Sequence, residues 1–408
     1  MTRTSRGLGA LPRFAMRKAL RHPAAIAGMI AVLVIAFLLF LYSLSGGSSA
    51  NLFSGHPYAN FDTAPYREVT QQQVNAWQDE VYATYGGVLT EEKHNALTDF
   101  INAYEAEDQK KREAQGGDSA ISFETLHSPE MFTKYRAAQD LQRMYRDTES
   151  RLARIAQLKG DFSPVGVLER SLLEAIPLVA NEPLGDADID FFSDFSLLSF
   201  LVSGVVILAL CDTFAKEKRT RMDEMAACTL RGRSTRFHAT ILGAGISCLV
   251  LLVVALLLCF IPMLLAGMHL NAPYQEYRGR SPYSMTELGA LGVYFLLSLL
   301  GLWCTAAVTL ACAAFLRGSV LPMLLSGMIC FGPPLAHVLL NSKGSLYLYT
   351  LAGLLVPEGS LMEFHAVTLG PVAIPQPVAT AVLWVLISAA LLILTQNHLR
   401  RRFARGIQ

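Results

Sequence analysis

Charged side chains are scarce in this sequence, and those present are unevenly placed. Only 16% of the 408 residues are Asp, Glu, Lys or Arg, whereas 52% are hydrophobic. Of the 33 acidic residues, 25 lie between positions 45 and 194, and most of the remaining chain consists of long apolar runs. The hydrocarbon of a bilayer is about 30 Å thick and needs a helix of roughly 20 apolar residues. Several runs of that length exclude a soluble enzyme and indicate an integral membrane protein.

Cysteine is missing from residues 45–194, so this segment must fold without disulfide bonds. The seven cysteines lie in apolar runs or in the loop 214–238, and none has the CxxC or Cys/His spacing of a metal site. No Gly-Lys pair occurs, so the chain has no Walker A motif to hold ATP phosphates. G-x-S-x-G and H-E-x-x-H motifs are also missing. The sequence therefore predicts no catalytic residue, no metal site and no ATP hydrolysis by this chain alone.

Six apolar runs are long enough to be membrane-spanning helices. The first, 24–44, follows a basic segment and precedes small residues, so a cleaved signal peptide is an alternative. The apolar region of a signal peptide has about 7–15 residues, whereas this run has 21, which favours an uncleaved anchor. The predicted spans are 24–44, 195–213, 239–267, 285–316, 320–340 and 378–397.

The stretch between the fifth and sixth spans is apolar but short. Its apolar part, 345–356, has only 12 residues, too few to cross the membrane. We expect a re-entrant or interfacial helix there, within an outer hairpin at 341–377. In the fifth span, Pro322, Pro333 and Pro334 are expected to break the backbone pattern.

Basic residues near the span ends give the orientation. They cluster in the N-terminal segment 1–23, which is also amphipathic, in the loop 214–238 and in the tail 398–408. With six spans these segments share one side, which is the cytoplasm by the positive-inside rule. We therefore expect a multi-pass protein of the bacterial plasma membrane with both termini cytoplasmic and residues 45–194 outside. Topology also explains why 45–194 is acidic by 12 charges and the remainder basic by 13, so no nucleic-acid partner follows.

The segment 45–194 is predicted to be a mostly helical extracytoplasmic domain built around an antiparallel hairpin, so the fold class is all-α. Apolar residues recur there at helical spacing, and His127-Ser128-Pro129-Glu130 is typical of a helix start. A later helix is expected from Pro164 to about Ile176. An aromatic stripe could bind a ligand and an acidic cluster a cation, but we favour helix packing for the stripe and a solvated linker for the cluster. The stripe comprises Trp77, Tyr82, Tyr85, Tyr104, Tyr135 and Tyr145, and the cluster Asp186, Asp188, Asp190 and Asp194.

Ionisable residues are nearly missing inside the predicted spans. Ion-coupled transporters keep such residues at mid-membrane depth because their charge is costly there and is retained for use. Asp212 and Glu287 lie at span ends, and His337 is the one deep candidate for a translocation or relay residue, although a structural role is the commoner one for a single His. This scarcity disfavours secondary transport. It leaves transport driven by the ATPase of a partner, or a membrane receptor or scaffold.

The loop after the second span has a distinctive pattern, FAKEKRTRMDEMAACTLRGRSTRFHAT from Phe214 to Thr240. It contains F-x-x-E, a short helix ending in Leu, and a Gly-Arg turn that leads into the third span. Together with six spans, the segment 1–23 and the hairpin before the sixth span, this loop resembles the membrane subunits (permeases) of bacterial ABC-2-type transporters. The resemblance covers residues 10–44 and 195–400.

The resemblance implies several partners. These are two copies of an ABC ATPase subunit that bind ATP and Mg, a second membrane subunit forming a homo- or heterodimer, the lipid bilayer, and an unidentified substrate or extracytoplasmic partner. No cofactor is expected on this chain itself. Apolar residues of the loop can form a stripe that docks the ATPase, or one that only lies on the membrane, and the resemblance favours docking. The residues implied in coupling to the ATPase are Phe214, Glu217, Arg219, Arg221, Met222, Met225, Leu230, Arg231, Gly232, Arg233 and Arg236.

Export of a peptide, lipid or other amphipathic substrate is the function that the resemblance implies. Two alternatives stay open. In the first, a non-transporting ABC complex relays ATPase motion to the extracytoplasmic domain, which the unusual length of 45–194 favours. In the second, the chain is a stand-alone envelope receptor.

Overall fold

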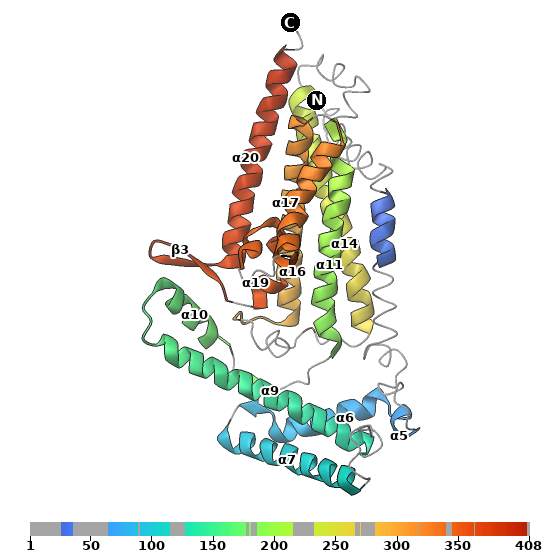
Figure 1. Cartoon of the computed structure of the whole chain (residues 1–408), viewed down its shortest axis with the longest axis vertical. Coiled ribbons are helices and arrows are strands. Elements are labelled where there is room, and N and C mark those ends of the chain that lie inside the picture. The colour runs from blue at the N-terminus through green and yellow to red at the C-terminus, as the bar shows by residue number, and fades with distance from the viewer. Residues whose placement is uncertain are drawn as a thin grey trace, which may run out of the picture.

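The structure is a computed structural model in two parts, a helical domain (64–180) and a helix bundle, stacked along the long axis of the molecule (Figure 1). The bundle contains the described residues outside the helical domain. The described residues are 26–35, 64–88, 90–114, 127–176, 179–180, 186–214, 232–265, 270, 282–316, 318–339, 345–362 and 364–405.

The helical domain is arranged around one long helix, α9, which contacts α6, α7 and α10. Side-chain hydroxyls of Thr70, Ser128 and Ser163 cap the starts of α6, α9 and α10, which satisfies backbone N–H groups that have no partner in the first turn. Helices occur where the helical spacing of apolar residues predicts them, whereas the sequence does not predict a small antiparallel strand pair, β1 with β2. The elements are α5 (Ala64–Arg67), α6 (Gln71–Tyr85), β1 (Gly87–Val88), α7 (Glu91–Ala114), α9 (Pro129–Leu158), α10 (Pro164–Glu174) and β2 (Val179–Ala180).

Aromatic and aliphatic side chains of α6, α7 and α9 form the core of this domain. Leu97 and Leu141 are fully buried, and Tyr104 stacks on Tyr135 with ring centroids 4.1 Å apart. Each fully buried side chain of this size contributes roughly 1.5–3 kcal/mol through loss of contact with water. Most of the aromatic stripe seen in the sequence is in this core, so the prediction of helix packing is confirmed.

Five helices of the bundle, among the residues described, are long and apolar enough to cross a membrane. The chain is therefore an all-α polytopic membrane protein. In Figure 1 these helices run alternately away from and towards the helical domain, so the end of α11, the start of α14 and the end of α20 lie at the far end of the bundle. The five are α11 (Asp186–Leu210), α14 (Gly232–Leu265), α16 (Glu287–Phe315), α17 (Val320–Leu339) and α20 (Gln376–Arg405).

Only Ile26–Ile35 of the first predicted span, 24–44, is described, and it is an apolar helix. It packs against α11, since a Cβ at Gly28 would lie 3.2 Å from Val205. Val32 and Ile35 contact the core of the bundle. This part of the predicted first span thus belongs to the bundle, and its remainder lies outside the described residues.

Two features of the long helices differ from those predicted. Helix α11 begins at Asp186, ahead of its apolar span Phe192–Leu210, so the acidic cluster predicted to be a linker is helical. Helix α17 keeps the predicted bounds to within one residue, but it continues through Pro333 and Pro334, which the sequence predicts to break it. Neighbouring helices can supply contacts that compensate for the hydrogen bonds that proline removes inside a membrane bundle. Pro322 lies in the first turn of α17, where the N–H has no partner within the helix in any case.

Helix α16 is the centre of the bundle and contacts α11, α14, α17 and α20. Much of its buried surface consists of small residues, among them Ala306, Ala307 and Ala311. Small side chains allow helix backbones to approach closely, which is the main source of association where lipid replaces water.

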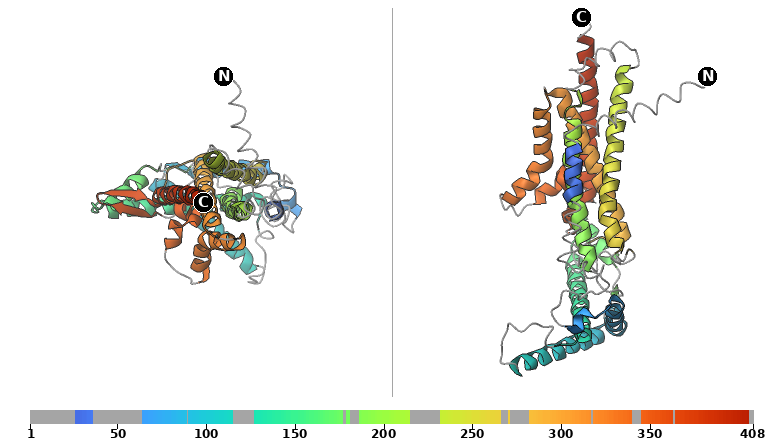
Figure 2. Two further views of the ribbon diagram at one scale, coloured as in Figure 1. Left: turned by 90° about the horizontal axis from the view of Figure 1, so that it is seen from above. Right: turned by 90° about the vertical axis from the view of Figure 1, so that its right-hand side faces the viewer.

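An antiparallel β-hairpin connects the two parts of the molecule. Strands β3 (Ala366–Leu369) and β4 (Val372–Pro375) precede α20 directly and contact α10 of the helical domain. Gly370 is the first of the two turn residues and has a φ of +63°. The common hairpin turns are types I′ and II′, and type I′ needs a positive φ at both positions, which Pro371 cannot adopt. The turn is therefore type II′. Figure 2 shows the hairpin extending sideways from the base of α20. The sequence predicts an outer hairpin at 341–377 but not these two strands within it.

Candidate functional site

The loop that resembles an ATPase-coupling loop connects α11 to α14. Phe214, just after α11, is half-buried and packs against the bundle core. The backbone of Gly232, Arg233 and Arg236 forms the start of α14. The remaining residues of the predicted coupling set lie outside the described residues, namely Glu217, Arg219, Arg221, Met222, Met225, Leu230 and Arg231. Both ends of the loop are at the far end of the bundle, away from the helical domain (Figure 1).

Three short helices between α17 and α20 enter the bundle, namely η1 (Ser345–Tyr349), α18 (Leu351–Leu355) and α19 (Glu358–Met362). We call them the re-entrant segment. Leu351, Leu354 and Leu355 are completely shielded from solvent, and α18 contacts α16, α17 and α20. Helix α18 is therefore packed inside the bundle, and the re-entrant position of residues 345–356 in a membrane stays a prediction.

Glycines make room for the re-entrant segment. A Cβ at Gly353 would lie 2.0 Å from the carbonyl oxygen of Leu348, closer than any side chain tolerates. At Gly301 of α16, a Cβ would lie 3.0 Å from Leu355. Close approach at Gly353 lets α18 fold back on η1, and close approach at Gly301 lets α18 pack against α16.

Helix α20 supplies hydrogen bonds to the carbonyl groups of the re-entrant segment. Gln376 is fully buried, and its Nε2 donates to the carbonyl oxygen of Leu348 at 2.6 Å. Trp384 Nε1 donates to the carbonyl oxygen of Tyr349 at 3.0 Å. Thr380 lies between them, accepts from Gln376 at 3.0 Å, and donates to the Leu348 carbonyl at 3.4 Å. These donors recur every four residues, which places them on one face of the helix.

Sequence reasoning missed this face of α20, although a signal was present. Polar residues at 376, 380 and 384 interrupt an otherwise apolar helix at helical spacing. In a membrane such a polar stripe must meet hydrogen-bond partners inside the protein, because lipid offers none.

His337, the predicted relay candidate, lies in the last turn of α17. Its ring packs on Tyr347 of η1, with centroids 4.3 Å apart and planes tilted by 31°. The contact places His337 beside the re-entrant segment, at the other end of α17 from the coupling loop. A relay role stays a prediction.

The helical domain contains a buried polar cluster beside its aromatic core. His127 Nε2 lies 2.9 Å from Asp108 Oδ1, and Arg112 donates to Asp108 Oδ2 at 2.7 Å. The His127 ring stacks on the Tyr104 ring with centroids 4.4 Å apart. The backbone carbonyl oxygen of His127 accepts a hydrogen bond from the Tyr66 hydroxyl. Burial opposes ionisation of Asp108, but the hydrogen bonds from Arg112 and His127 outweigh it, so its pKa lies below the usual value. The arrangement holds the start of α9 against α7.

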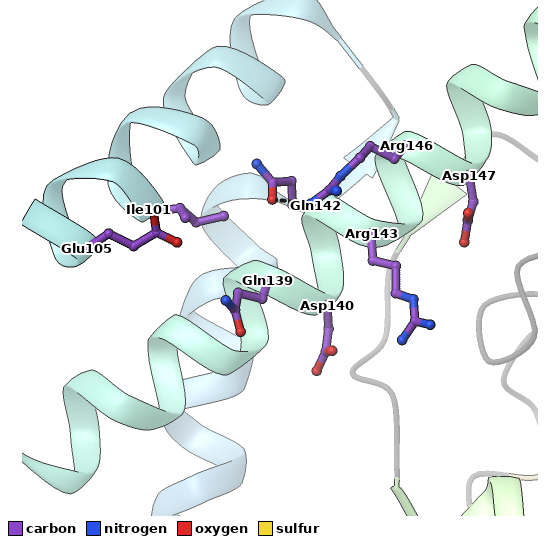
Figure 3. A pocket seen from close by; sticks show the side chains of 8 residues that line it. All are labelled: Ile101, Glu105, Gln139, Asp140, Gln142, Arg143, Arg146 and Asp147. Carbon is purple, nitrogen blue, oxygen red and sulfur yellow. Dashed lines mark hydrogen bonds between the residues drawn. The ribbon is translucent and has the colours of Figure 1, made fainter. Parts of the chain in front are cut away.

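A depression of about 460 Å³ lies between α7 and α9 on the surface of the helical domain (Figure 3). The side chains that line it form hydrogen bonds mainly with other residues of the domain. The Tyr135 hydroxyl donates to Glu105 and accepts from Gln139, and Arg146 donates to Gln142. Among the described residues, no group of three His, Cys, Asp or Glu side chains is placed to hold a metal ion. The depression is a solvated mixed-charge surface. Its lining residues are Ile101, Glu105, Gln139, Asp140, Gln142, Arg143, Arg146 and Asp147.

Gly353→Ala should destabilise the bundle because the new methyl group overlaps the Leu348 carbonyl oxygen. Overpacking of this kind typically costs about 1–3 kcal/mol or more. The matched control is Gly327→Ala in α17, where a Cβ meets nothing within 4 Å. Thermal unfolding of the detergent-solubilised chain should show a lower midpoint for Gly353→Ala alone, and equal midpoints would contradict the packing described.

Lowering the pH should destabilise the helical domain, in part because Asp108 becomes protonated. Because its pKa is lowered in the folded protein, ionised Asp108 contributes stability at neutral pH that is lost as the pH falls below about 4. Hydrogen-exchange protection of α7, normalised for the intrinsic rate at each pH, should fall less steeply from pH 5 to pH 3 in the Asp108→Asn variant than in the native protein. The exposed Asp99 on the same helix provides the control, since Asp99→Asn should keep the native profile. The same slope in all three proteins would show that Asp108 is not responsible.

Comparisons with known proteins provide no further identification of the site. No family model, curated protein or solved structure matches this chain.

Proposed function

We propose that this chain is the membrane subunit of an ABC-2-type transporter that is driven by a separate ATPase. The observation that carries the proposal is the re-entrant segment, buried between the last two long helices of the bundle. A hairpin in this position, before the final span, is what the resemblance implies. The helix Ile26–Ile35, packed on α11, supports a sixth span at the N-terminal end.

The placement of the coupling loop supports the same function. The loop joins α11 to α14 at the end of the bundle opposite the helical domain, where α20 also ends in a run of arginines (Figure 1). In our proposal this end faces the cytoplasm of a bacterial cell, by the positive-inside rule. Two ATPase subunits dock on residues 214–238 of two membrane subunits, and their closure on ATP moves the adjoining helices. The substrate is a peptide, a lipid or another amphipathic molecule that is exported.

A second candidate function is relay of ATPase motion to the helical domain without transport. The contact of α10 with the β3–β4 hairpin favours it, because the hairpin continues directly into α20. Arg154 of α9 holds α10 through two hydrogen bonds to Glu169, at 2.7 and 3.0 Å. Movement of α20 would thereby reach α10 and α9. A sealed surface between the two membrane subunits would favour this candidate, and a wide cavity there would favour transport.

Charge reversal in the coupling loop tests the proposal. Arg231→Glu with Arg233→Glu should weaken the ATPase contact at least about tenfold, because unpairing a buried charge at an interface costs about 2–5 kcal/mol. In liposomes containing the co-purified ATPase, stimulation of ATP hydrolysis by the membrane subunit should be lost.

The control reverses charges at the same end of the bundle but outside the loop, with Arg400→Glu and Arg401→Glu in α20, and should retain stimulation. Unchanged stimulation in the Arg231 and Arg233 variant would contradict the coupling assignment. Failure to co-purify any ATPase would favour a stand-alone receptor instead.

A further inference from the structure

The β3–β4 hairpin has the composition of the membrane helix that follows it rather than that of the helical domain it touches. No Asp, Glu, Lys or Arg occurs from Phe364 to Leu399, a stretch that contains the hairpin and most of α20. Helix α10, which carries Glu169, Arg170 and Glu174, thus contacts two strands without formal charge. This uncharged composition suits contact with lipid better than contact with water.

The tip of the hairpin presents two large apolar side chains. Leu369 and Val372 are cross-strand partners on either side of the Gly370-Pro371 turn. They are 65% and 56% exposed, although shorter side chains would serve a turn in water equally well. An exposed two-stranded hairpin with an apolar tip is a site of aggregation unless something covers it.

The position of the hairpin indicates what covers its apolar tip. In Figures 1 and 2 it extends sideways from the first turn of α20, and α10 lies on its side towards the helical domain. Just beyond that turn, the exposed apolar surface of α20 begins with Val378 and continues with Val382. In a polytopic membrane protein this surface faces lipid, so the hairpin tip lies level with the edge of the hydrocarbon.

We propose that the β3–β4 hairpin is a membrane-interface anchor, with Leu369 and Val372 inserted between the lipid headgroups. The outer edges of its two strands carry backbone N–H and C=O groups that pair with neither strand, and such groups are not tolerated deep in hydrocarbon. Headgroup depth satisfies them with water while the two tip side chains reach the acyl chains. Pro371 and Pro375 have no backbone N–H, so the hairpin has two fewer donors that need water. Since the strands carry no formal charge, neutral lipid is sufficient for the contact.

The anchor would fix α10 at the bilayer surface and thereby set the height of the helical domain above it. It depends on the membrane insertion of the bundle and not on transport or on an ATPase. It therefore stands or falls independently of the proposed function.

Site-specific labelling in phosphatidylcholine liposomes tests the anchor. Leu369→Cys and Val372→Cys, in a full-length chain whose native cysteines are replaced, are labelled with an environment-sensitive fluorophore. The probe should emit at shorter wavelength than in water. A nitroxide near the headgroup should quench it several-fold more strongly than it quenches the control, Ala106→Cys, on the exposed face of α7.

Two outcomes would overturn the proposal. A probe at Leu369 that behaves like the one at Ala106 would show that water surrounds the tip. A probe that is shielded from water yet not quenched by lipid nitroxide would show that protein, such as a second copy of this chain, covers the hairpin.

Discussion

Satisfaction of buried backbone carbonyl groups is the constraint on which this bundle depends. The re-entrant segment places short helices among long ones, and short helices end in carbonyl groups without partners. Lipid cannot supply donors, so the protein must. Gln376 and Trp384 on one face of α20 provide them to Leu348 and Tyr349. The last span and the segment before it therefore form one hydrogen-bonded unit.

This unit connects the parts of the molecule that bear on function. Its close packing against α16 requires glycine at 301, the fold of α18 back on η1 requires glycine at 353, and the start of α20 follows directly from the β3–β4 hairpin. The hairpin in turn contacts α10, which Arg154 holds to α9 of the helical domain. A movement of α20 would thus shift both the re-entrant segment inside the bundle and the helical domain. Transport and relay both need a connection of this kind, which is why they are the two candidate functions.

The sequence predicted features that follow from periodicity and length, and it missed those that depend on contacts between distant segments. Long apolar runs predicted five of the long helices, and the Ser128-Pro129 pair predicted the start of α9. The strands of the hairpin at 366–375 were missed because each has only four residues, too few for a clear alternation. Continuity of α17 through Pro333 depends on tertiary packing, which no local pattern reveals. The coupling set was derived from a resemblance, and most of it lies outside the described residues.

The account rests on the coupling loop and the helical domain lying on opposite faces of the membrane. An impermeant maleimide applied to intact cells measures this directly, using Ala106→Cys and Arg231→Cys in a chain without its native cysteines. The account predicts that the cysteine at 106 is labelled at once and the cysteine at 231 only after the membrane is permeabilised. Labelling of both positions in intact cells, or the reverse pattern, would contradict it.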